Sequence, residues 1–74
     1  MAGLPLVPGD TGPMVQQMQT AVIAKGYSVG PAGADGNFNE DTTNGLLAFQ
    51  DNDALPVQPK CDHQCWTALG LPGS

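Results

Sequence analysis

Three side chains that can bind metals or act as nucleophiles stand close together near the C-terminal end of the chain: Cys61, His63 and Cys65. A structural zinc site takes four protein ligands, and the chain has no other cysteine or histidine. A Cys–His nucleophilic pair needs a cleft and a third group that orients the base, which a chain of 74 residues rarely builds. We therefore expect no metal here, and the plain interpretation is two small buried thiols beside an exposed histidine.

Oxygen ligands alternate along another segment, as they do at the start of a calcium loop: Asp35, Asn37, Asn39 and Asp41. That loop also needs a glycine at its sixth position and an acid at its twelfth, where this chain has Glu40 and Leu46. A turn followed by a helix cap explains the same residues. The remaining acids are dispersed, and no group of side chains meets the geometric requirements of a catalytic site. We predict a non-catalytic chain without a cofactor.

The elements that position these groups are three predicted helices, at residues 13–26, about 39–53 and about 63–69. Pro13 suits the first helical position, and Gly26 suits the C-terminal stop of that helix. The apolar residues of the first helix recur at spacings of three and four, which is typical of an amphipathic helix: Met14, Val15, Met18, Val22 and Ile23. The sequence predicts an all-α domain, a small three-helix bundle built from turn–helix units.

Local signals specify how these helices start and pack. Asn39 and Asp62 are good N-caps for the second and third helices. Gly45 inside the second helix indicates a close approach by another helix. Gln19 and Gln50 each follow an inward-facing residue, and we expect their amides to hydrogen-bond loop backbone. One core is predicted, made of Val15, Met18, Val22, Phe38, Leu46, Phe49, Leu55, Trp66 and Leu69.

The turn before the second predicted helix is weakly repeated before the third. Residues 35–42 align with residues 58–65, which pairs Phe38 with Cys61 as inward-facing anchors. In the first of these turns we expect Gly36 to take a positive φ. The rest of the chain varies the same turn–helix plan.

Charge limits the partners of this chain. The formal net charge is −5, and Lys25 and Lys60 are the only basic side chains apart from one histidine. Nucleic acids and anionic membranes attract clustered Lys and Arg, so we expect neither as a partner. No apolar run approaches the roughly 20 residues that span a bilayer, and residues 1–4 lack the basic start of a signal peptide. A neutral ligand, such as a peptide or a sugar, fits this composition better. We expect the chain to be a monomer.

Six motifs in order resemble the peptidoglycan-binding-domain-like family of three-helix modules: Gly9-Asp10-x-Gly12-x-x-Val15-x-x-Met18-Gln19, Gly26-Tyr27, Asp35-Gly36-x-Phe38-x-x-x-Thr42, Phe49-Gln50, Leu55-Pro-Val and Trp66-x-x-Leu69. The resemblance covers residues 6–71, between apparent linker ends at residues 1–5 and 72–74. Three departures fall in the last third, where Gln58-Pro59 replaces Asp-Gly, Asp62-His63 replaces Gly-Pro, and Cys65 replaces Thr.

The resemblance implies an orthogonal three-helix bundle that attaches to bacterial peptidoglycan without catalysis, beside a covalently linked hydrolase domain such as an amidase or that of a phage endolysin. The expected location is extracellular or associated with the cell wall. This location also makes a Cys61–Cys65 disulfide one of the open alternatives. We expect the ligand in a shallow groove near the second helix, with contacts from Tyr27, Asn44, Asp51 and Asn52, and we expect the Tyr27 ring to be exposed.

Two other hypotheses belong to different classes of function. The same fold can serve as a structural or protein-interaction module, and the shortage of aromatic residues, 5% of the chain, favours this alternative over sugar binding. A zinc or redox switch at Cys61 and Cys65 is the third hypothesis. Binding to purified cell walls separates the first two, and a thiol count with metal analysis tests the third.

Overall fold

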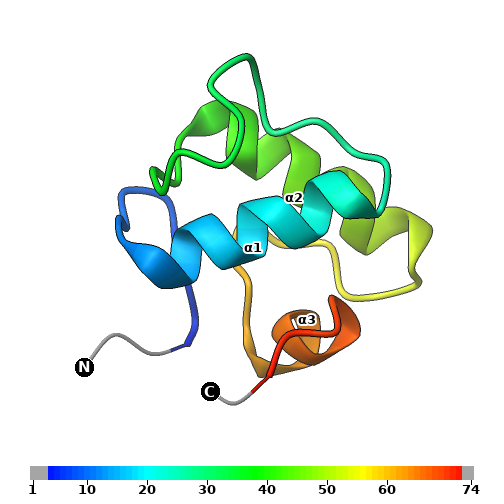
Figure 1. Cartoon of the computed structure of the whole chain (residues 1–74). Helices are drawn as coiled ribbons and strands as arrows, with labels where there is room; N and C mark the ends of the chain where they lie inside the picture. The colour runs from blue at the N-terminus through cyan, green and yellow to red at the C-terminus, as the bar shows by residue number, and fades with distance from the viewer. Residues whose placement is uncertain (1–3, 73–74) are drawn as a thin grey trace.

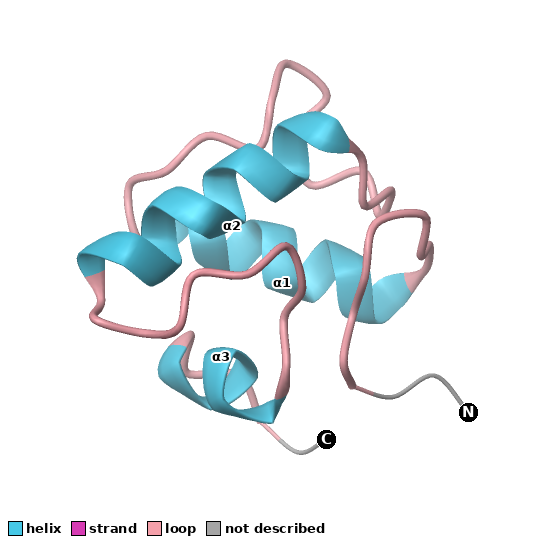
Figure 2. Cartoon of the chain, turned by 180° about the vertical axis from the view of Figure 1, so that it is seen from behind, coloured by secondary structure: helices cyan, strands magenta, loops and turns pink. Residues whose placement is uncertain are grey.

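The computed structural model describes residues 4–72, in which three helices and their loops enclose one core (Figure 1). The helices are α1 (Pro13–Ala24), α2 (Glu40–Asn52) and α3 (His63–Ala68). Both views show α1 and α2 crossing each other, with the short α3 on one side of the pair (Figure 2). The predicted all-α three-helix bundle is confirmed. No helix in this part of the chain is long and apolar enough to cross a membrane.

The first helix ends at Ala24, two residues earlier than the sequence predicted. Gly26 terminates it as expected, with a φ of 100° and an amide that donates to the Ile23 carbonyl oxygen at 2.9 Å. The expectation that Ile23 belongs to the apolar face is wrong, because its side chain is 44% exposed whereas that of Val22 is fully buried. Successive helical residues point about 100° apart at 3.6 residues per turn, and at Ile23 this turn carries the side chain out of the core toward solvent.

Side-chain caps start the other two helices as predicted. Asn39 Oδ1 accepts from the Thr42 amide at 2.9 Å, and Asp62 Oδ1 accepts from the Cys65 amide at 3.0 Å. Each bond satisfies an amide that has no partner inside its own helix. The last helix stops at Ala68 rather than Leu69, which forms its C-cap.

The two glycines that the sequence singled out have separate roles. Gly36 takes a φ of 83°, as predicted, and a Cβ there would lie 3.3 Å from the Gly12 carbonyl oxygen. Gly45 permits a close approach, but the neighbour is a loop and not a helix. A Cβ at Gly45 would collide with the carbonyl oxygen of Ser28, so the loop after α1 lies directly on α2.

The core contains every predicted member except Leu55, which is half-buried at its edge. Leu55 lies in the loop beyond α2, outside the three helices. The buried set also includes residues that helical periodicity did not reveal: Leu6, Val29, Cys61 and Cys65. Leu6 and Cys61 pair through an isolated antiparallel bridge, as do Thr11 and Asn37, and these bridges tie the N-terminal segment to the turns before α3 and α2.

Candidate functional site

The side chain of Gln19 on α1 holds the turn before α2. It is fully buried, its Nε2 donates to the Asn37 carbonyl at 2.8 Å and to Thr42 Oγ1 at 2.9 Å, and its Oε1 accepts from the Gly36 amide at 2.7 Å. Burying an amide is tolerated when its hydrogen bonds are satisfied. The expected role of Gln19 is therefore confirmed, and that role is structural.

Gln50 on α2 holds the turn before α3 in the same way. Its Nε2 donates to the Lys60 carbonyl at 2.8 Å, and its Oε1 accepts from the Gln58 amide at 2.9 Å. The residue aligned with Gly36 is Pro59, which has no amide hydrogen to donate, so the donor moves to Gln58. This arrangement explains how the departure from Asp-Gly is accommodated, and it confirms the expected role of Gln50.

The thiols of Cys61 and Cys65 are both buried and free, and their sulfur atoms lie 2.9 Å apart. The hydrogen bond from the Cys61 thiol lowers the pKa of Cys65, and a hydrogen bond from Gln50 lowers it further. Burial acts in the opposite direction and raises this pKa. The same hydrogen bond and burial raise the pKa of Cys61. Cys65 aligns with Thr42, and a glutamine amide contacts each of them. A disulfide between the two cysteines remains a prediction.

The Asp35 side chain closes a hydrogen-bonded turn. Asp35 Oδ1 accepts from the Asn37 amide at 3.0 Å and from Gln19 Nε2 at 3.2 Å. These bonds, the Asn37 amide first and then Gln19, lower the pKa of Asp35. Within residues 4–72 no three Asp, Glu, His or Cys side chains are grouped so that they could hold a metal ion.

The four predicted ligand contacts are divided between α2 and the loop before it. Asn44 and Asp51 are exposed and lie about two turns apart along α2. Asn52 Nδ2 donates to the Ala48 carbonyl of the same helix at 2.9 Å. Tyr27 is half-buried, contrary to expectation, because its ring packs edge-on against Phe49 with centroids 6.2 Å apart. Their role in binding stays a prediction.

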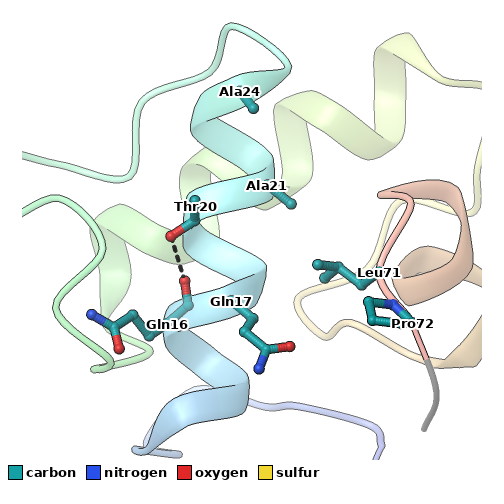
Figure 3. A pocket seen from close by; sticks show the side chains of 7 residues that line it. All are labelled: Gln16, Gln17, Thr20, Ala21, Ala24, Leu71 and Pro72. Carbon is teal, nitrogen blue, oxygen red and sulfur yellow. Dashed lines mark hydrogen bonds between the residues drawn. The ribbon is translucent and has the colours of Figure 1, made fainter.

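A pocket lies elsewhere, between α1 and the C-terminal segment, and we call it the α1/C-terminal pocket (Figure 3). Its volume is about 590 Å³, within the roughly 300–1,000 Å³ typical of small-ligand sites. Leu71 and Pro72 form one wall. The other wall is made of the α1 residues Gln16, Gln17, Thr20, Ala21 and Ala24.

The C-terminal wall of this pocket is fixed to α3. Trp66 Nε1 donates to the Pro72 carbonyl at 3.2 Å, and the Leu71 amide donates to the Trp66 carbonyl at 3.3 Å. Sequence reasoning missed the pocket because Pro72 was assigned to a linker end. The small residues Ala21 and Ala24, three apart on α1, were the available signal.

Comparison with known proteins places the chain in a family. The family model described as "Putative peptidoglycan binding domain" matches residues 11–69. A Bacillus licheniformis protein named "Probable N-acetylmuramoyl-L-alanine amidase" is 33% identical over 49 residues, which are 66% of this chain and 14% of that protein. The present chain therefore spans about one seventh of that relative's length.

Two solved structures share the fold. The SleB N-terminal domain superposes with a TM-score of 0.84 at 24% identity, over 95% of this chain and 93% of that one. The endolysin of Burkholderia phage AP3 gives a TM-score of 0.80 at 25% identity, over 95% of this chain and 27% of that one. With the family match over residues 11–69, the conclusion is that this chain belongs to the peptidoglycan-binding domain family.

Proposed function

We propose that this chain is a non-catalytic module that binds bacterial peptidoglycan and holds an attached hydrolase domain on that polymer. The family match over residues 11–69 carries the proposal. The similar amidase and endolysin are much longer than the matched module, which supports a hydrolase elsewhere in the parent protein. Linking the two parts raises the effective concentration of the hydrolase at its insoluble substrate.

The chemistry of the described residues supports a binding role over a catalytic one. Cys65 is buried against Cys61, and the amides of Gln19 and Gln50 are used to hold turns. Asp35 is likewise used to close the turn before α2, and Asp62 is used as the N-cap of α3. The side chains that resemble catalytic groups in the sequence therefore act as structural partners.

Charge and location complete the proposal. The module acts outside the cell or at the cell wall, as a monomer, and binds neither nucleic acid nor membrane. Seven acidic residues against two lysines support the last point, because nucleic acids and anionic lipids repel such a surface.

Sedimentation with purified cell-wall sacculi tests this function. We expect the chain to pellet with sacculi but not with cellulose, and to release no soluble sugar or peptide. Raising the salt concentration should weaken binding little, because few attractive ion pairs are available to screen. Failure to pellet with sacculi of several wall types would favour the protein-interaction hypothesis, and release of fragments would show a catalytic chain.

A further inference from the structure

We propose that the α1/C-terminal pocket binds the short alanine-rich peptides of peptidoglycan and not its glycan strands, an inference that rests on the proposed function. Peptidoglycan combines two chemistries, N-acetylated sugar chains and short peptides. The lining of the pocket distinguishes between them.

The apolar walls of the pocket suit small methyl side chains. Ala21 faces Leu71 and Pro72 across the gap (Figure 3), and Ala24 extends the same wall toward the end of α1. Apolar burial stabilises in proportion to the area removed from water. Alanine methyl groups can lie between these surfaces without displacing a core side chain.

One side-chain amide in the pocket is available to a peptide. Gln17 is exposed and extends on the side of α1 that faces Pro72 (Figure 3), and within residues 4–72 its amide makes no hydrogen bond. By contrast, Gln16 Nε2 donates to the Ala34 carbonyl at 3.1 Å, and Thr20 Oγ1 donates to the Gln16 carbonyl at 2.9 Å. A carboxamide has both donors and an acceptor, so Gln17 can pair with both polar atoms of a peptide group.

The pocket offers no aromatic surface to a sugar ring. Trp66, Phe38 and Phe49 are buried, and Tyr27 packs its ring against Phe49. None of these four, which are all the aromatic residues of the chain, lines the pocket. Stacking on an aromatic face, a main source of affinity for flat apolar surfaces, is therefore absent there.

The charge of the lining agrees with a neutral ligand. All the residues that line the pocket are uncharged, although the chain has a net charge of −5. A ligand that carries carboxylates meets repulsion over an acidic surface, and this pocket is a site free of acidic side chains. The methyl side chain of alanine carries no charge and matches this lining.

Three forms of cell wall test the assignment with the 74-residue chain. We expect binding to intact sacculi, loss of binding to sacculi from which an amidase has removed the peptides, and competition by the released peptide fraction. Retention on the peptide-free glycan would overturn the inference while leaving the proposed function standing. Failure of the chain to bind intact sacculi would overturn the proposed function itself.

A matched pair of variants tests the pocket. Gln17→Glu replaces an amide by a carboxylate of the same shape and should weaken binding about tenfold or more, the effect of one lost hydrogen-bond donor plus the cost of removing a carboxylate from water. Gln64→Glu makes the same change at an exposed position of α3 and should leave binding unchanged. Equal melting temperatures of both variants and the wild-type chain establish folding.

The location is checked independently by NMR titration with the released peptide fraction. We expect the amide signals of Thr20, Ala21 and Leu71 to shift most. Unchanged binding by a folded Gln17→Glu variant, or shifts concentrated on α2 together with loss of binding in Asn44→Asp, would overturn the assignment of the ligand to this pocket.

Discussion

Gln19 and Gln50 make corresponding contacts in the two halves of the domain. Each donates Nε2–H to the carbonyl of an aligned turn residue, Asn37 in the first half and Lys60 in the second, and both distances are 2.8 Å. Each also accepts a backbone amide on Oε1. In each half, a buried side-chain amide thus pairs with the backbone of the turn before the next helix. Both α2 and α3 therefore depend on a side chain from the helix that precedes them.

Removal of the Gln19 amide is expected to destabilise the fold strongly. Gln19→Met keeps the side-chain length but leaves the Gly36 amide without its partner and removes the hydrogen bonds from Nε2 to the Asn37 carbonyl and to Thr42 Oγ1. At about 1–3 kcal/mol for the unsatisfied amide and about 0.5–1.5 kcal/mol for each of the two other lost hydrogen bonds, we expect a loss of about 2–5 kcal/mol, measured by urea unfolding. Gln17→Met, at an exposed position of the same helix, should change stability by less than about 0.5 kcal/mol. Equal effects of the two substitutions would contradict the role of Gln19 in holding the turn before α2.

Phe38 is the anchor that the turn before α2 delivers into the core. Its side chain is 3% exposed, and its backbone amide and carbonyl pair with Asp10 and Gly9. Phe38→Ala should cost about 3–5 kcal/mol through lost burial and a cavity, a large part of the stability of a domain this small. Thermal unfolding measures this, and an unchanged melting temperature would show that Phe38 is not an anchor.

The features that the sequence predicted correctly depend on local patterns. Asn39 and Asp62 are capping residues directly before apolar periodicity, and Gln19 and Gln50 follow buried positions, so short-range rules identified their roles. The partner of Gly45 depends instead on how the loop after α1 folds back, which spacing along the chain does not determine.

The pocket was missed for a related physical reason. It forms only because Trp66 and the tail hydrogen-bond to each other and bring Leu71 beside α1. Nothing in the composition of residues 70–72 distinguishes a docked tail from a linker. The burial of Val29 and the edge contact of Tyr27 on Phe49 likewise follow from the path of a loop, not from helical periodicity.

Gly45 gives a test in which two principles predict opposite signs. Alanine in a helix interior is favoured over glycine by about 1 kcal/mol, so propensity alone predicts that Gly45→Ala stabilises α2. The Ser28 carbonyl oxygen occupies the space that the added methyl group needs, and overpacking costs typically about 1–3 kcal/mol. We expect net destabilisation in urea unfolding. A more stable Gly45→Ala variant would show that the loop moves aside easily.

Asp35 is expected to make the stability of the fold depend on pH in the acidic range. Its pKa is lowered from the ordinary value of 3.8, first by the Asn37 amide and then by Gln19. A lowered folded pKa means that its stabilisation is present above about pH 4 and is lost as the pH falls through the folded pKa. NMR titration of the Asp35 carboxyl should give a midpoint below that of a model peptide. In Asp35→Asn this part of the acid dependence should disappear, and an unchanged acid profile would contradict the assignment.

Cys61 and Cys65 are expected to form a disulfide under oxidising conditions. Their sulfur atoms are 2.9 Å apart in the reduced protein. When local opening exposes the pair, one thiolate attacks oxidised glutathione and the other then displaces the bound glutathione. The two thiols lose two protons and two electrons, and two reduced glutathione molecules form. Mass spectrometry should show a loss of two hydrogens, and thiol titration in denaturant should fall to zero. Persistence of both thiols in the folded chain would contradict this prediction.

The disulfide should add little stability and should not be required for binding. The loop that it closes is very short, and the entropic stabilisation by a disulfide grows with loop length. Cys65→Thr gives the sharpest control, because Thr42 occupies the aligned position and accepts from Gln19 Nε2 at 2.9 Å, so a threonine at residue 65 can accept from Gln50 in the same way. We expect this variant to fold, to form no disulfide and to sediment with sacculi like the wild type. Loss of sedimentation in a folded Cys65→Thr variant would move the ligand to α3 and favour a redox role for the cysteines.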